Sequence, residues 1–263
     1  MPEELAGGVA NAGRVWRAGD IVVRPAPANA GTIHALLSHL ASNRVPVPRP
    51  VGLLPDGMEA VAFIPGETSL PPYREEWIRS PHVVSEVGWA LRSFHEATRD
   101  FVAPRDAFWS LELADPAGGP VICHNDVCIE NVVFEDGQLV GLLDFDFAAP
   151  GRPIWDLAMT ARYWAPLLDP ESRSGTGREG LDPFDRLQVL IDAYDAGEAD
   201  RSSFVEVLFE IEEVALAFVM ARVGRGEEAF IEMWHGYGGY ERHRRKMGWL
   251  EANRARLSDA ASG

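Results

Sequence analysis

Hydrophobic and polar positions divide the chain into a first part that favours strands and a longer second part that favours helices. The apolar, β-branched run at 21–23 follows a Gly19-Asp20 turn, and two further apolar runs flank the turn at 55–57. Apolar runs on both sides of such turns predict β-hairpins. Between these hairpins, apolar residues recur at helical spacing over 33–40, and Thr32 is the predicted N-cap of that helix.

The best candidate for a boundary between two parts of the chain is Pro65-Gly66, because the secondary-structure pattern and the charge balance both change there. We therefore expect a small N-terminal lobe over residues 1–66 and a larger C-terminal lobe over residues 67–263. Residues 170–182 show no apolar pattern and are predicted to form a mobile loop. Apolar spacing predicts helices over four ranges of the larger lobe: 83–98, 183–196, 203–223 and 227–257.

The chain carries a net charge of −16, from 40 acidic and 24 basic side chains. Nucleic acids and anionic membranes attract basic surfaces, so we expect neither as a partner. Residues 1–66 hold five acids and five bases, and the whole acidic excess lies in residues 67–263. Two interpretations stay open: a solvated, soluble surface, or a field that attracts a cationic substrate. Glu206, Glu210 and Glu213 recur at helical spacing and fit either interpretation.

The first residues and the cysteines bear on the cellular compartment. The chain begins with acidic residues and contains no long apolar run, so neither a signal peptide nor a membrane span is predicted. Cys123 and Cys128 are the only cysteines, which argues against a secreted disulfide framework. We expect a cytoplasmic protein with two buried, inert thiols.

One segment in the middle of the chain contains the side chains best suited to chemistry. Apolar strands at 132–134 and 139–143 flank a Glu-Asp-Gly turn, and this pattern predicts a hairpin. Folding of the hairpin brings Asn131, just before the first strand, beside Asp144, just after the second. Their amide and carboxylate oxygens suit Mg²⁺. Asp126 on the preceding loop could act as a base, although Asp126 and Asn131 could instead satisfy turn backbone groups.

These residues resemble a known motif. The sequence His124-x-Asp126-x₄-Asn131, followed by Asp144, is similar to the catalytic loop and metal-binding motif shared by protein kinases and the aminoglycoside phosphotransferase and choline kinase family. Asn125 stands where that family usually has glycine. A second stretch also resembles this family, in its metal-binding segment and the helix that follows. It reads Asp144-Phe145-Asp146-x₄-Gly151-x-Pro153-x₂-Asp156-Leu157-Ala158.

The resemblance implies an α+β, bilobal, protein-kinase-like fold, with a small β-rich lobe that binds nucleotide and a larger, mostly helical lobe. It implies that Asp126 accepts or orients the substrate hydroxyl, and that Asn131 and Asp144 hold Mg²⁺ against the phosphates of ATP or GTP. Asp146 could contact a second ion or face solvent. Asp156 is expected to cap the following helix and to brace the catalytic loop.

In the small lobe the resemblance implies further nucleotide contacts. Gly8 could lie over the phosphates, and Phe63 and Ile64 match the hinge that holds the base, although both also fit an ordinary strand core. Arg24 stands where the family usually has a phosphate-binding lysine, and the next helix lacks the glutamate that pairs with that lysine, offering His34 and His39 instead. Either another acid positions Arg24, or nucleotide binding is weaker than in a typical member.

The sequence therefore predicts a Mg²⁺-dependent kinase that transfers the γ-phosphate of ATP or GTP to a small-molecule hydroxyl. The acidic larger lobe favours a cationic acceptor, such as an aminoglycoside-like compound or an amino alcohol. The alternative is a nucleotide-binding pseudoenzyme with little or no kinase activity; the altered lysine position favours it, and retention of Asp126, Asn131 and Asp144 argues against it. A metal-dependent hydrolase would need more converging histidines than the seven scattered here.

Overall fold

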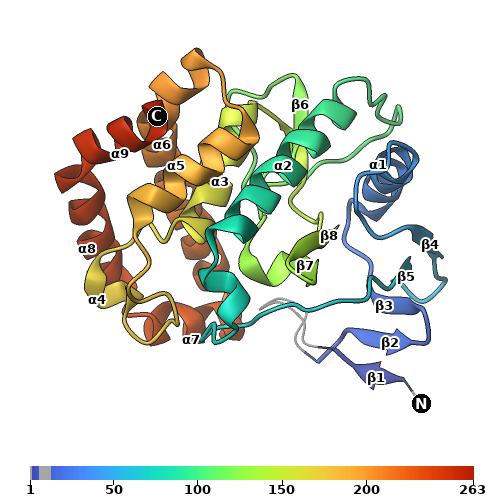
Figure 1. Ribbon diagram of the computed structural model, residues 1–263. Helices are drawn as coiled ribbons and strands as arrows, with labels where there is room; N and C mark the ends of the chain where they lie inside the picture. Colours follow the sequence, from blue (N-terminus) through green and yellow to red (C-terminus); the bar gives the residue numbers. More distant parts are fainter. Residues whose placement is uncertain (1, 6–12) are drawn as a thin grey trace.

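The computed structural model describes residues 2–5 and 13–263, which form two parts (Figure 1). The N-terminal part is an antiparallel sheet with the strand order β1-β2-β3-β5-β4. Both predicted hairpins are confirmed, and the pairing of β3 with β5 places Arg24 directly opposite Glu59. The strands are β1 (Glu3–Glu4), β2 (Trp16–Ala18), β3 (Ile21–Pro25), β4 (Pro50–Leu53) and β5 (Met58–Ala62).

The predicted helix of the N-terminal part is α1 (Ala30–Ser42), which packs against β4 and against α2 (Pro81–Thr98). Its predicted start is wrong, because the helix begins at Ala30 and the Thr32 hydroxyl accepts a hydrogen bond from the Phe108 backbone N–H at 2.9 Å. Asn29, at the N-cap position, donates from Nδ2 to the carbonyl oxygen of Asp146 at 2.9 Å. The start of α1 is therefore tied to the C-terminal part.

The chain crosses from the sheet to the C-terminal part over residues 63–67. Glu67 exchanges two backbone hydrogen bonds with Phe134 of β7 (Val132–Glu135). A Cβ atom on Gly66, where φ is +141°, would lie 2.7 Å from the carbonyl oxygen of Phe134. Glycine at this position therefore allows the crossing segment to approach the strand closely. The division predicted at residue 66 falls within this crossing.

Helices make up most of the C-terminal part, which fills the left of the view in Figure 1. Helix α2 follows a Ser80 cap and packs against α5. Phe94, Trp155 and Trp164 are fully buried in the interior, where each such side chain contributes roughly 1.5–3 kcal/mol. The remaining elements up to residue 224 are η1 (Glu76–Arg79), β6 (Val121–Cys123), η2 (Ile129–Asn131), β8 (Gln138–Leu142), β9 (Ala149–Gly151), α3 (Pro153–Trp164), α4 (Pro170–Arg173), α5 (Pro183–Tyr194) and α6 (Glu198–Gly224).

Two predictions for the C-terminal part are wrong. The range 227–257 is not one helix but three, namely α7 (Glu228–Gly236), α8 (Gly239–Ala252) and α9 (Arg254–Ser262). Gly238 and Gly239 adopt positive φ between α7 and α8, and Asn253 leaves helical geometry between α8 and α9. The range 170–182 contains α4, which Asp169 caps. A backbone hydrogen bond of 3.0 Å from Tyr73 to Thr176 attaches this segment to the stretch between the crossing and η1.

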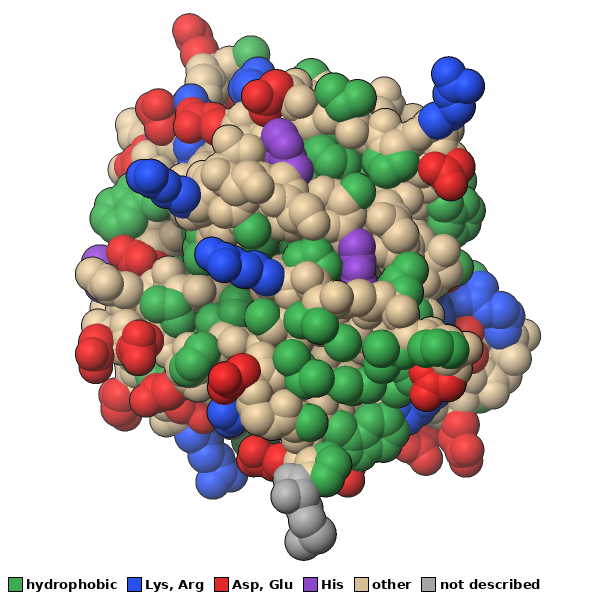
Figure 2. All heavy atoms as spheres, turned by 90° about the vertical axis from the view of Figure 1, so that its right-hand side faces the viewer, with side chains coloured by type: hydrophobic (Ala, Val, Ile, Leu, Met, Phe, Trp, Pro, Cys, Tyr) green, Lys and Arg blue, Asp and Glu red, His purple; other side chains and the backbone are tan. Residues whose placement is uncertain are grey.

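The face on the right of Figure 1 is turned towards the viewer in Figure 2, where hydrophobic side chains gather across its lower half. β4 is an edge strand of the sheet, and Val51 and Leu53 on it are more than half exposed. Within the described ranges, none of the helices combines the length and the apolar composition that crossing a bilayer requires.

Candidate active site

Asp126 lies on the loop between β6 and β7, where two side chains hold its carboxylate. The Asn131 amide donates to Oδ2 at 3.0 Å, and the Tyr163 hydroxyl donates to Oδ1 at 3.1 Å. Burial raises the pKa of Asp126 to about 7, and the negative charge of Asp144 adds to the rise. A carboxylate in this state can exchange a proton with a bound hydroxyl near neutral pH.

The hairpin of β7 and β8 brings Asn131 and Asp144 together at its open end. The Leu143 backbone N–H donates to the Asn131 carbonyl oxygen at 2.8 Å, which fixes the two strand ends beside each other. Nδ2 of Asn131 also donates to the backbone carbonyl of Asp126 at 3.0 Å. Asp144 adopts φ +60°, a left-handed conformation that aspartate tolerates better than most residues.

The donor atoms at this hairpin end fit a hard cation. Asn131 donates through its amide nitrogen, and no hydrogen bond from the described residues reaches its Oδ1. Asp144 bonds Arg24 through Oδ1 alone, and Asp146 supplies a further carboxylate. Mg²⁺ takes oxygen ligands and keeps several positions for water and phosphate oxygens, so this set of residues fits it.

Asp156, from α3, holds the loop that precedes Asp126. Its carboxylate accepts hydrogen bonds from the backbone N–H groups of His124 at 2.6 Å and Asn125 at 2.8 Å, and His95 Nε2 lies 3.0 Å away. Although burial favours the neutral acid, the hydrogen bond with His95 holds the pKa of Asp156 below its ordinary value. The expected brace is therefore present, but the expected cap is not, because α3 begins at Pro153 and Asp156 lies in its first turn.

Asn125, the departure from the usual His-Gly-Asp pattern, has a conformational explanation. Its backbone adopts φ +66°, which glycine reaches without strain and asparagine tolerates better than most residues. The side-chain amide then donates to the carbonyl oxygen of Phe147 at 2.8 Å. The substitution therefore preserves the shape of the loop.

Arg24 contacts three carboxylates. Nε donates to Glu59 at 2.6 Å, Nη1 donates to Asp144 at 2.9 Å, and Nη2 donates to Asp146. Burial alone would lower the pKa of Arg24, but the three carboxylates raise it above its ordinary value. Burial together with the charge of Asp144 raises the pKa of Asp146 to about 7.

Glu59 is the acid that positions Arg24, and the sequence analysis did not identify it. It lies on β5 rather than on α1, and its side chain is only 2% exposed. His34 of α1 contacts the other oxygen of Glu59 at 3.0 Å. The strand register supplies the signal that could have found this pair, because β3 and β5 place Arg24 and Glu59 opposite each other.

The other predicted nucleotide contacts lie apart from this cluster or outside the described residues. Gly8 falls in the range 6–12, outside the described residues. Phe63 lies in the crossing, where its backbone N–H bonds Asp20 at 2.9 Å and its ring lies 3.7 Å from the Arg17 guanidinium carbon. Ile64 packs beside Gly141 of β8. The assignment of Phe63 and Ile64 to a base-binding hinge stays a prediction.

The glutamates that the sequence analysis placed on a substrate-facing or solvated helix face are partly engaged by arginines. Glu206 pairs with Arg254 at 2.6 Å, and Glu210 pairs with Arg152 at 2.9 Å. Their neighbour Glu212 on the same helix is buried. Its position four residues after buried Leu208 was the available signal.

Glu212 forms a buried ion triad with Arg162 and Lys246. Its Oε1 accepts from Arg162 Nε at 2.7 Å, and its Oε2 accepts from Lys246 Nζ at 2.6 Å. Burial alone would raise the pKa of Glu212, but the two cations lower it to about 2. Burial lowers the pKa of Lys246 to about 8, because one carboxylate has to serve two cations.

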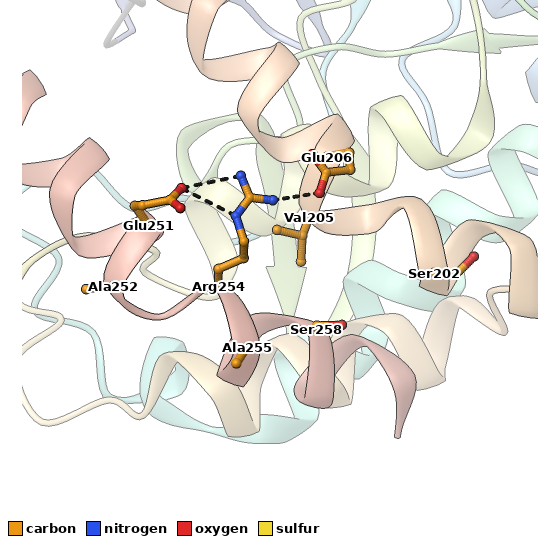
Figure 3. Close-up of a pocket in the computed structure, with 8 residues that line it drawn as sticks. All are labelled: Ser202, Val205, Glu206, Glu251, Ala252, Arg254, Ala255 and Ser258. Carbon is orange, nitrogen blue, oxygen red and sulfur yellow. Dashed lines mark hydrogen bonds and ion pairs between the residues drawn. The ribbon is translucent and has the colours of Figure 1, made fainter.

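A separate hollow of about 500 Å³ lies between α6, α8 and α9 (Figure 3). Arg254 crosses it between Glu251 and Glu206, as the dashed contacts in Figure 3 show. The hollow shares no residue with the surroundings of Asp126. Its lining residues are Ser202, Val205, Glu206, Glu251, Ala252, Arg254, Ala255 and Ser258.

The two-part α+β architecture, with its Asp126 loop and its hairpin, is that of a kinase-like phosphotransferase. Residues 87–190 match the family model described as the phosphotransferase enzyme family. The trifolitoxin immunity protein of Rhizobium leguminosarum bv. trifolii is 32% identical over 204 residues, covering 74% of this chain and 75% of that protein. The chain therefore belongs to the phosphotransferase enzyme family.

Two further relatives bear on the fold and the activity. A homoserine kinase of Chelativorans sp. (strain BNC1) is 29% identical over 169 residues, covering 49% of this chain and 51% of that kinase. The chain therefore spans about half the length of that kinase. The crystal structure of a choline/ethanolamine kinase family protein from Mesorhizobium loti superposes with a TM-score of 0.66 at 18% identity, covering 100% of this chain and 92% of that one. The predicted α+β, kinase-like fold class is confirmed.

Proposed function

We propose that this chain is a Mg²⁺-dependent small-molecule kinase, which transfers the γ-phosphate of ATP or GTP to a hydroxyl of an amine-bearing acceptor. The observation that carries the proposal is the state of Asp126. Its carboxylate is held by Asn131 and Tyr163, next to the hairpin end that carries Asp144, and its pKa is raised to about 7. A general base works best when its pKa lies near the operating pH.

In the proposed reaction Asp126 accepts the proton of the acceptor hydroxyl. The acceptor oxygen forms a bond to the γ-phosphorus, and the bond from that phosphorus to the oxygen shared with the β-phosphate breaks, in line and without a covalent enzyme intermediate. Asn131 and Asp144 would hold Mg²⁺, which neutralises charge on the β- and γ-phosphates when bound. Tyr163 keeps Asp126 in a fixed orientation by donating to Oδ1.

Arg24 is the proposed phosphate-binding residue in place of the usual lysine. Glu59 orients its guanidinium from the neighbouring strand, while Nη1 and Nη2 point to Asp144 and Asp146. The same contacts support a second candidate, a nucleotide-binding pseudoenzyme, because Arg24 already forms ion pairs with two carboxylates that the kinase would use for the metal. The two candidates differ in turnover and not in nucleotide binding.

A screen of nucleotide consumption, measured with and without Mg²⁺, tests the proposal. The candidate acceptors in the screen are amino alcohols, hydroxy amino acids, sugars and amine-bearing antibiotics. The antibiotics are included because the relative named for immunity to trifolitoxin suggests a protective role. The kinase predicts acceptor-dependent consumption that Asp126→Asn lowers by about 10²–10⁴-fold. Nucleotide binding without consumption for every acceptor would establish the pseudoenzyme instead.

A further inference from the structure

Arg178, in the segment between α4 and α5, is a buried cation without a carboxylate partner. The residue is only 8% exposed. Its Nη1 donates to the Tyr163 backbone carbonyl at 3.0 Å, and its Nε has no hydrogen-bond partner. Among residues 2–5 and 13–263, no carboxylate oxygen lies within ion-pair distance of its guanidinium. Desolvating a charge in this way is unfavourable unless a partner of opposite charge binds.

Arg242 of α8 is a second cation in the same surroundings. It is partly buried, with its guanidinium carbon 4.9 Å from the centre of the Tyr237 ring. No ion pair or hydrogen bond of its side chain occurs within the described part of the chain. Burial lowers the pKa of Arg178; the negative charge of Glu130 opposes this change, and the positive charge of Arg242 adds to it.

Two acids whose charge acts on Arg242 also contact other cations. Glu212 serves Arg162 and Lys246, as described above, and Asp169 lies 3.6 Å from Arg245. Although the chain has 40 acidic and 24 basic side chains, neither Arg178 nor Arg242 forms an ion pair within residues 2–5 and 13–263. This pattern is typical of a site whose missing anion is a ligand.

Tyr163 connects Arg178 to Asp126. Its backbone carbonyl accepts from Arg178, and its hydroxyl donates to Asp126. Tyr73 gives a second connection, because its ring lies 5.2 Å from the Arg178 guanidinium carbon and its hydroxyl donates to Glu130 at 2.8 Å. Glu130 follows Asp126 by four residues along the same loop.

We propose that Arg178 and Arg242 bind an anionic group, a carboxylate or a phosphate, on the acceptor whose hydroxyl approaches Asp126. The inference rests on the proposed function for the identity of Asp126 as the reacting end of the site. It changes the expected acceptor from a simple cation to a molecule that carries an anion as well as its hydroxyl. Planar guanidinium groups can contact either anion through two parallel hydrogen bonds.

Calorimetry with matched pairs of probes tests the proposal without turnover. L-homoserine and 3-amino-1-propanol share the hydroxyl and the amine but differ in the carboxylate, and glycerol 3-phosphate and glycerol differ in the phosphate. At least one anionic probe should bind the wild-type protein about ten- to a hundredfold more tightly than its counterpart, because the counterpart lacks the anion that would form charge-assisted hydrogen bonds with the guanidinium groups. The pair that shows the preference distinguishes carboxylate from phosphate.

Arg242→Gln should remove most of that preference, since it deletes one guanidinium from a partly exposed position whose described contact is the Tyr237 ring. Arg244→Gln on the same helix is the control, because Arg244 is 72% exposed and pairs only with Glu241. Equal binding of each probe pair by the wild-type protein, or an unchanged preference in Arg242→Gln, would overturn the inference. A preference for the anionic probe without nucleotide consumption would reject the kinase and retain the anion site.

Discussion

Replacement of Glu212 by glutamine should destabilise the protein, because it removes the carboxylate that two buried cations share. Arg162 and Lys246 contact Glu212 at 2.7 Å and 2.6 Å, and their side chains are 14% and 13% exposed. Glutamine keeps the size of the side chain but cannot neutralise either cation. Removing one member of a buried ion cluster leaves uncompensated charge in the interior.

The size of the effect follows from the pKa of Glu212. Burial by itself would raise this pKa, but the two cations lower it from 4.5 to about 2. Such a shift corresponds to about 3 kcal/mol of stability at neutral pH. Because the folded-state pKa is depressed, this stability is complete above pH 4.5 and is lost as the pH falls towards 2. We therefore expect Glu212→Gln to lose about 2–3 kcal/mol of stability at pH 7.

Urea unfolding of the wild-type protein, Glu212→Gln and Glu213→Gln at pH 7 and pH 4 measures this loss. Glu213 is exposed and adjacent in sequence, so its variant should change stability by no more than about 0.5 kcal/mol. The cost of Glu212→Gln should be smaller at pH 4, by roughly 1 kcal/mol. A cost no larger than that of Glu213→Gln, or a cost that increases on acidification, would refute the reasoning.

Three further predictions concern the proposed active site. Asp126→Asn should lower turnover by about 10²–10⁴-fold and leave nucleotide affinity nearly unchanged, as steady-state kinetics and calorimetry can measure; unchanged turnover contradicts its assignment as the base. Asp144→Ala should abolish the tightening of nucleotide binding by Mg²⁺ in calorimetry, and a full Mg²⁺ effect in the variant would place the ion elsewhere. Arg24→Ala should weaken triphosphate binding about ten- to a hundredfold but adenosine binding little, with partial recovery in Arg24→Lys; equal weakening for both ligands would mean that Arg24 only holds the sheet to the larger lobe.

The parts of the fold that local patterns determine could be predicted from the sequence. The hairpin of β7 and β8 follows from two apolar runs around a turn, and that hairpin alone places Asn131 beside Asp144. The start of α1 could not be predicted in the same way. Threonine is a common helix cap, but the Thr32 hydroxyl instead accepts a hydrogen bond from the backbone N–H of Phe108, which lies far along the chain.

Side-chain pairing between distant segments accounts for most of what the sequence did not reveal. The register of β3 and β5 places Glu59 opposite Arg24, and the two side chains form an ion pair. The family pattern instead led us to look for the acidic partner on α1. Arg178 lies in a stretch without apolar periodicity, and only the docking of that stretch near Tyr163 buries it. The acidic composition likewise gave no indication that Arg178 and Arg242 form no ion pair within the described part of the chain.

The ion triad also gives the protein an unusual reactivity towards amine reagents. Lys246 is the only lysine in the sequence, and contact with Glu212 of α6 covers its ammonium group. An acylating reagent should therefore spare the side chains of the folded protein and attach one group when α8 separates from α6. Mass spectrometry of the acylated chain would then count opened molecules without any engineered label.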